Sequence, residues 1–212
     1  LLARAERGGR CVCIGGGLLG LEAAAALARR GLEVTVLEGA PSLLHRQLAR
    51  PAAALLERHL AGQGLTLRCS ARSEEIIGDP AVRGVRLAGG ELLPAELVVV
   101  AAGIRPDLAL ARSAELPLGR GLQVDDRMRT ADPAIWAAGD GTEHRGVLYG
   151  IWPASYLQGV VAGTDLAGGV AEFPGLPPSN RLKVAQVDLF SVGRFEPGED
   201  AATRGRARGS ER

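Results

Sequence analysis

Aromatic side chains are scarce in this chain of 212 residues, and large rings therefore cannot dominate its core. Phe, Trp and Tyr together make up 3% of the sequence, while glycine alone accounts for 30 residues. The core has to be built from Leu, Val, Ile and Ala, and the apolar content of 46% is ordinary for a globular protein. The length allows one large domain or two small ones.

Charge imbalance, cysteine pairs and long apolar runs are also missing. A formal net charge of +1 excludes the basic footprint of a nucleic-acid-binding protein. Three cysteines form no Cys-x-x-Cys pair, and we interpret Cys11 and Cys13, which share one strand face, as small buried apolar residues. Glu22 and several glycines interrupt the apolar stretch at residues 11–28, which argues against a membrane span. We expect a soluble, cytoplasmic protein without nucleic-acid or membrane partners.

The most informative feature that is present lies between residues 11 and 38. An apolar strand runs through Gly15-x-Gly17-x-x-Gly20 directly into an alanine-rich helix, and a second strand then ends at Glu38. The first glycine of such a run permits a sharp turn, the second lets a pyrophosphate approach the backbone, and the third allows close helix–strand packing. Amides at the helix start favour an anion. We predict a dinucleotide site in which Glu38 binds the ribose; the alternative is a glycine-rich turn without a ligand.

Periodicity and turn residues predict an α/β fold, a Rossmann-type doubly wound domain with an antiparallel meander, up to about residue 105. Beyond a connector at 105–121, we expect a strand ending in Gly139-Asp140, a helix from about 153 to 168, a stiff proline-rich linker at 173–180 and a disordered Arg/Gly/Ser-rich end. The expected elements of the first part are strands 10–14, 33–37 and 65–68, helices 18–30 and about 51–61, a meander within 74–93 and a parallel strand at 97–101 covered on both faces.

Five segments carry a further pattern. They are CIGGGLLGLEAAAALARRGLEVTVLEGAPSLL, LVVVAAGIRPD, IWAAGD, YGIWPASYLQGVVAGTDLAGG and RLKVAQVDLFSVGRFEPGE. Together they resemble the pyridine nucleotide-disulfide reductase superfamily, whose members bind FAD and a nicotinamide dinucleotide, and within it they are most similar to the rubredoxin and nitrite reductase flavoproteins. The resemblance implies an NAD(P)H-binding domain at 9–105, the C-terminal part of an FAD-binding domain at 106–172, a linker and the start of an interface domain at 173–200, and a tail at 201–212.

The resemblance also implies roles for individual residues. Glu38 repels a 2′-phosphate, so NADH is favoured over NADPH, and Arg46 softens that repulsion if it folds back. Glu22 matches an acidic position near the nicotinamide, with a solvated helix surface as the alternative. Gly139 and Asp140 match the ribityl-binding position of FAD, with a turn or cap acid as the alternative. The remaining expected nicotinamide-dinucleotide contacts are Gly15, Gly17, Leu18, Leu19, Gly20, Glu38 and Gly103.

The rare aromatic residues gather in the second part of the chain. Both tryptophans and both tyrosines fall between residues 136 and 156, which indicates a flat ligand or an interface, with core packing as the alternative. We interpret His144 as an exposed loop residue, with a place at a flavin edge as the alternative.

The function implied by the resemblance is that of an FAD-dependent NAD(P)H oxidoreductase. Hydride would pass from NADH to flavin, and electrons to a carrier such as rubredoxin or to a nitrite-reducing centre, without a catalytic acid, base or metal.

Only one glycine fingerprint is present where the family has two. The hydrogen bond of Asp140 to FAD would contribute about 1.5–3 kcal/mol, whereas micromolar binding needs roughly 8 kcal/mol. Asp140 alone therefore cannot hold FAD tightly. We expect a truncated chain that needs a complementary chain or a homodimer; the alternatives are a non-catalytic nicotinamide-binding module and a degenerate product that does not fold.

Overall fold

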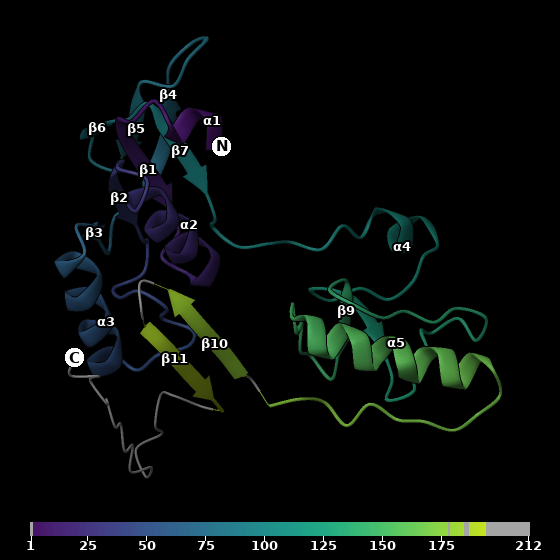
Figure 1. Ribbon diagram of the computed structural model, residues 1–212. Helices are drawn as coiled ribbons and strands as arrows, with labels where there is room; N and C mark the ends of the chain where they lie inside the picture. Colours follow the sequence, from purple (N-terminus) through teal and green to yellow (C-terminus); the bar gives the residue numbers. More distant parts are fainter. Residues whose placement is uncertain (1, 178, 185–186, 194–212) are drawn as a thin grey trace. The chain divides into compact units, whose positions relative to one another are not determined.

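The computed structural model describes residues 2–177, 179–184 and 187–193, and these form two compact units (Figure 1). The first, called the N-terminal unit, contains the described residues up to 103 and those from 179 onward. The second, called the central unit, contains residues 104–177.

The N-terminal unit is built on a parallel sheet of four strands in the order β3-β2-β1-β7. Short apolar runs rich in β-branched residues form the strands, and alanine-rich or amphipathic segments form the connecting helices. Pro51 lies in the first turn of its helix, where its missing N–H costs nothing. The elements are β1 (Arg10–Ile14), α2 (Leu18–Ala28), β2 (Glu33–Leu37), α3 (Arg50–Gly62), β3 (Thr66–Arg68) and β7 (Leu97–Val100).

Different layers cover the two faces of this sheet. Cys11 and Cys13 point toward α2 and α3 and belong to the large apolar cluster between sheet and helices. Val12 points to the other face, where an antiparallel meander covers it. The meander consists of β4 (Ser73–Ile77), β5 (Gly84–Leu87) and β6 (Leu92–Pro94). The predicted Rossmann-type fold class and the burial of both cysteines are therefore confirmed.

Strand β7 agrees with the sequence-based expectation but lies at the edge of the sheet. We predicted a parallel strand covered on both faces; it is parallel to β1, Leu97 and Val99 pack against the cluster on the helix side, and Val98 packs against the cluster under the meander. The strand is, however, the last one of the sheet, its residues are only partly buried, and Val100 is 62% exposed. A continuous apolar run does not distinguish an edge strand from a central one.

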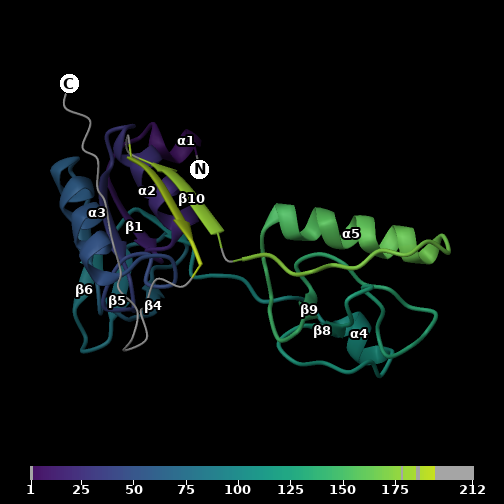
Figure 2. The same ribbon diagram turned by 90° about the horizontal axis from the view of Figure 1, so that it is seen from below.

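Two further elements complete the N-terminal unit. The short helix α1 (Leu2–Ala5) was not predicted from the sequence. Its Ala5 is buried in the large apolar cluster between the sheet and the helices α2 and α3. Strands β10 (Ser179–Val184) and β11 (Val187–Val192) form an antiparallel hairpin beside α2 (Figures 1 and 2). Val187 and Leu189 pack against the same cluster, because alternate residues of β11 face inward.

The central unit contains a parallel pair of strands, one short helix and one long helix. They are α4 (Ala109–Ser113), β8 (Leu122–Val124), β9 (Thr142–His144) and α5 (Trp152–Leu166), and β8 pairs with β9. Met128, Ala154, Val161 and Phe173 form its buried apolar cluster.

Two predictions for this unit are wrong in detail. The strand β9 begins after Gly139-Asp140 rather than ending there, and the preceding segment forms only an isolated bridge between Arg129 and Trp136. The expected linker also starts too early, because Phe173 is fully buried and its amide donates to the Asp126 carbonyl at 2.7 Å. Proline content marks a stiff segment, but it does not show whether that segment packs against the fold.

The predicted tail at 201–212 lies outside the described residues. Within the described part of the chain, every helix is too short or too polar to cross a membrane.

Candidate nucleotide-binding site

Three predicted site residues meet at the carboxyl edge of the parallel sheet. Gly15 follows β1, Glu38 follows β2, and Gly103 lies shortly after β7. The Gly15 amide donates to the Leu37 carbonyl at 2.7 Å, which ties the start of the glycine loop to the end of the neighbouring strand. Ligands of open α/β sheets bind at this edge, so the arrangement fits a nucleotide site.

The three fingerprint glycines are needed for different reasons. Gly15 has φ +116°, and a Cβ there would lie 2.3 Å from the Ala101 carbonyl oxygen. A Cβ on Gly20 would lie 1.9 Å from the Gly15 carbonyl oxygen. Gly17 instead has an ordinary φ of −84°, and a Cβ there would meet nothing within 4 Å. The fold itself therefore requires Gly15 and Gly20, whereas the open space beside Gly17 is suited to a ligand.

Glu38 holds the glycine loop in place. Its Oε2 accepts a hydrogen bond from the Gly16 amide at 2.9 Å, and its Oε1 accepts one from the Ala40 amide at 2.8 Å. Each carboxylate oxygen has a second lone pair available for a ribose hydroxyl. The side chain thus has a structural role that the sequence did not reveal, next to the predicted ribose contact.

Gly16 is a functional position that sequence reasoning missed. A Cβ there would lie 2.5 Å from Cδ2 of Leu43, a buried residue of the loop after β2. The Gly16 carbonyl accepts a hydrogen bond from the Leu44 amide at 3.1 Å, and Leu44 has φ +50°. The run of three consecutive glycines was the available signal, because the fingerprint alone explains only two of them.

The remaining predicted residues of the N-terminal unit border the loop or lie on the surface. Leu18 is partly buried at the start of α2, whereas Leu19 is 71% exposed. Their amides belong to the first helical turn, where backbone N–H groups have no partner within the helix. Glu22 and Arg46 are both exposed. These free amides, the cradle formed by the glycines and the nearby carboxylate fit the pyrophosphate and ribose of a dinucleotide.

The predicted flavin contact lies in the central unit. Asp140 is exposed, and its Oδ1 accepts a hydrogen bond from Ser155 Oγ of α5 at 2.9 Å. Gly139 precedes it with φ +100°, and its amide donates to Oε1 of Gln158 at 2.8 Å. An exposed carboxylate anchored on one oxygen has acceptor capacity left for a hydroxyl group, which fits a ribityl chain.

Ser155 and Gln158 were also missed from the sequence. A signal was available for Gln158, since it shares a helical spacing with the buried residues Ala154, Val161 and Asp165. A polar residue on the inward face of an amphipathic helix has to find a hydrogen-bond partner.

The burial of His144 corrects the sequence-based interpretation, whereas the aromatic residues divide between the two alternatives given for them. The histidine is 1% exposed rather than an exposed loop residue. Its Nε2 lies 2.8 Å from Asp126 Oδ1, and its ring packs edge-on against Phe173. Tyr149 contacts the same phenylalanine, so core packing explains part of the aromatic cluster.

Trp152 and Tyr156 form the exposed part of that cluster. Their rings are stacked with centroids 5.2 Å apart on the first turns of α5, and they are 74% and 57% exposed. This surface position is consistent with the interface or ligand interpretation.

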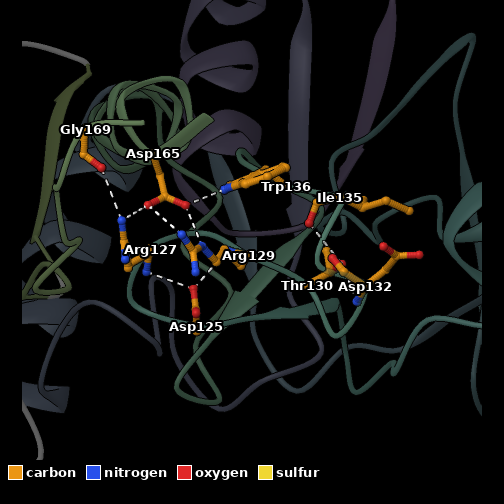
Figure 3. Close-up of polar contacts among 9 residues, drawn as sticks. All are labelled: Asp125, Arg127, Arg129, Thr130, Asp132, Ile135, Trp136, Asp165 and Gly169. Carbon is orange, nitrogen blue, oxygen red and sulfur yellow. Dashed lines mark hydrogen bonds and ion pairs between the residues drawn. The ribbon is translucent and has the colours of Figure 1, made fainter. Parts of the chain in front are cut away.

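A buried ionic cluster anchors the segment before Gly139 to the end of α5 (Figure 3). The Asp165 side chain is completely buried and forms ion pairs with both Arg127 and Arg129. Trp136 Nε1 donates to the same carboxylate at 2.8 Å. The hydrogen bond from Arg129, with the help of Trp136 and Arg127, keeps the pKa of Asp165 below its usual range.

A family model for pyridine nucleotide-disulphide oxidoreductases matches residues 1–159. The chain belongs to this family. The predicted superfamily is therefore confirmed.

Two relatives at the sequence level are reductases whose names include a nicotinamide nucleotide. The NAD(P)H nitrite reductase of Bacillus subtilis is 40% identical over 201 residues, which cover 94% of this chain and 25% of that protein. The rubredoxin-NAD(+) reductase of Pseudomonas putida is 38% identical over 140 residues, 66% of this chain and 36% of that protein.

Solved structures agree on the fold. A ferredoxin reductase from Rhodopseudomonas palustris has a TM-score of 0.80 and 30% identity, covering 89% of this chain and 48% of its own. An NAD-dependent persulfide reductase from A. fulgidus has a TM-score of 0.81 and 34% identity, with coverage of 86% and 36%. The chain thus spans about a quarter to a half of the length of these four proteins.

Proposed function

We propose that this chain is the nicotinamide-binding part of an FAD-dependent NAD(P)H oxidoreductase. The observation that carries this proposal is the carboxyl edge of the sheet, where Gly15 and Gly20 are sterically required and Gly17 is left open. Residues 2–103 of the N-terminal unit correspond to the NAD(P)H-binding domain. The central unit corresponds to the C-terminal part of an FAD-binding domain, and the β10–β11 hairpin to the start of an interface domain.

The residues of this chain bind and orient rather than exchange protons. Amides of Leu18 and Leu19 hold the pyrophosphate, Glu38 binds the adenosine ribose, and Gly103 and Glu22 border the nucleotide. Asp140 binds the ribityl chain of FAD. When bound, the flavin accepts a hydride from the nicotinamide and releases electrons to an acceptor. The names of the relatives favour rubredoxin or a nitrite-reducing centre as that acceptor.

Glu38 supports a preference for NADH. Its two anchored carboxylate oxygens keep a negative charge at the ribose position, where the 2′-phosphate of NADPH would be repelled. Arg46 is exposed on the following loop and is the cation that would reduce this repulsion.

Calorimetric titration of the chain with NADH and NADPH tests the proposal. We expect heat of binding with NADH, weaker binding of NADPH, and a smaller difference between the two nucleotides in Glu38→Gln. Absence of NADH binding in well-folded protein would contradict the assignment of the site. NADH binding without any FAD binding, even after addition of the remaining parts of the flavin domain, would favour a non-catalytic nicotinamide-binding module.

A further inference from the structure

Gln158 is a buried amide that faces the Gly139-Asp140 turn from α5. The residue is 1% exposed and lies on the inward face of the helix. Its Oε1 accepts the hydrogen bond from the Gly139 amide at 2.8 Å and lies 3.0 Å from Thr142 Oγ1. A buried polar side chain is unfavourable unless it is hydrogen-bonded, so the oxygen of Gln158 has a specific partner in this turn.

The orientation of the Gln158 amide follows from that partner. A backbone N–H can only donate, so the atom that faces Gly139 must be the oxygen. The Nε2 group is then buried and has no hydrogen-bond partner within the described part of the chain. Since an unpaired buried N–H is costly, the contribution of this side chain lies in its oxygen.

The turn held by Gln158 carries Asp140. The Gly139 carbonyl accepts hydrogen bonds from the amide and the hydroxyl of Thr142, at 3.0 and 2.7 Å. With its N–H bound to Gln158 and its carbonyl bound to Thr142, Gly139 is fixed on both sides. The direction in which the chain continues to Asp140 is fixed with it, and Ser155 then anchors the carboxylate.

We propose that Gln158 is a positioning residue for the flavin contact at Asp140. Its side-chain oxygen fixes the Gly139 amide and thereby places the Asp140 carboxylate where it meets the ribityl chain. This inference rests on the proposed function, because the flavin contact of Asp140 is itself part of that proposal.

Substitutions of Gln158 test the inference through FAD affinity, measured by flavin fluorescence on this chain supplemented with the remaining parts of a flavin domain. Gln158→Met has a similar length but no acceptor oxygen, and we expect FAD to bind about 3- to 10-fold more weakly. Gln158→Glu keeps an acceptor oxygen, so affinity should return to near the original value. NADH affinity should not change in either variant, and tryptophan fluorescence during thermal unfolding checks that both are folded. If Gln158→Met does not fold, FAD affinity is compared between Gln158→Glu, which keeps an acceptor oxygen, and Gln158→Leu, which lacks one.

Asp140→Asn distinguishes the two ways in which the inference can fail. We expect this variant to weaken FAD binding, and Gln158→Met to add little when combined with it, because Gln158 acts through Asp140. If Asp140→Asn weakens binding and Gln158→Met does not, the positioning role is overturned and the proposed flavin contact stands. If Asp140→Asn leaves FAD binding unchanged, or if no FAD binds, the flavin contact fails and the positioning role fails with it.

Discussion

The two units of this protein bury different kinds of side chain. The described core of the N-terminal unit is apolar on both faces of its sheet. The central unit has a small apolar cluster, and it contains every buried polar or charged side chain of the described residues. These are Thr142, His144, Gln158 and Asp165.

This difference changes how each unit places its functional residues. Apolar burial is non-directional and tolerates swaps that keep the volume. The N-terminal unit therefore fixes its loop through close backbone contacts at Gly15 and Gly20, together with the partly buried carboxylate of Glu38. Hydrogen bonds and ion pairs are directional, so the central unit fixes Asp140 through side chains such as Gln158 and Ser155. We therefore expect the central unit to be more sensitive to single substitutions.

The largest effect is expected for Phe173→Ala. The ring is fully buried against His144 and Tyr149, and its removal should destabilise the central unit by about 3–5 kcal/mol. Both tryptophans of the sequence lie in this unit, so denaturant unfolding followed by tryptophan fluorescence measures its stability. Val170→Ala, at a position 83% exposed, is the matched control. Similar stability of the two variants would show that residue 173 belongs to a linker after all.

A smaller loss of stability is expected for Asp165→Asn. The substitution removes the negative charge shared by Arg127 and Arg129, and two partly buried cations then remain without their partner. The melting temperature of the central unit should fall by about 5–10 °C. Glu115→Gln removes the same charge at an exposed position and should change the melting temperature little. If both substitutions lowered the melting temperature equally, the ion pairs of Asp165 would contribute nothing to stability beyond the net charge of the chain.

The sequence was sufficient to predict the parallel sheet and glycine loop of the N-terminal unit, because their signals are local. Apolar periodicity defined β1, α2 and β2, and the glycine spacing located the turn between them. The anchoring of Gly16 by Glu38 joins residues 22 positions apart and leaves no such periodic signal.

The central unit was predicted less well for the same reason. His144 was assigned to the surface, and Phe173 to a linker, because their burial depends on contacts with Asp126 across the fold. The polar positions on the inward face of α5 were readable as buried, but their partners were not. A pattern shows which side chains need a partner and does not show which residue provides it.

Gly17→Ala is expected to affect ligand binding without affecting stability. The backbone of Gly17 is in an ordinary conformation and a Cβ meets nothing within 4 Å, so the stability of the N-terminal unit should change by less than about 0.5 kcal/mol. The methyl group would occupy the space proposed for the pyrophosphate, and NADH should bind about tenfold more weakly. Gly20→Ala provides the contrast, because its Cβ would overlap the Gly15 carbonyl and unfold the loop. Unchanged NADH affinity in Gly17→Ala would contradict the predicted site.

The smallest effect is expected in acid. The hydrogen bond from Arg145, followed by that from His144, lowers the pKa of Asp126 to about 2. Because this pKa is lower in the folded than in the unfolded state, the ionised carboxylate stabilises the central unit above about pH 4. That stabilisation is lost as the pH falls from about 4 towards 2 and Asp126 becomes protonated.

Comparison with the N-terminal unit tests whether this acid sensitivity is local. Glu96 has a pKa lowered to about 2 by its hydrogen bond from Arg10. The melting temperatures of the original chain and of Asp126→Asn are read from tryptophan fluorescence. The original chain should melt at the higher temperature, by an amount that is constant above about pH 5 and that shrinks towards zero near pH 2. Glu96→Gln should leave that signal unchanged, because both tryptophans lie in the central unit. If Glu96→Gln changed this melting temperature as much as Asp126→Asn does, the two units would unfold together. Their stabilities would then not be independent, despite their different cores.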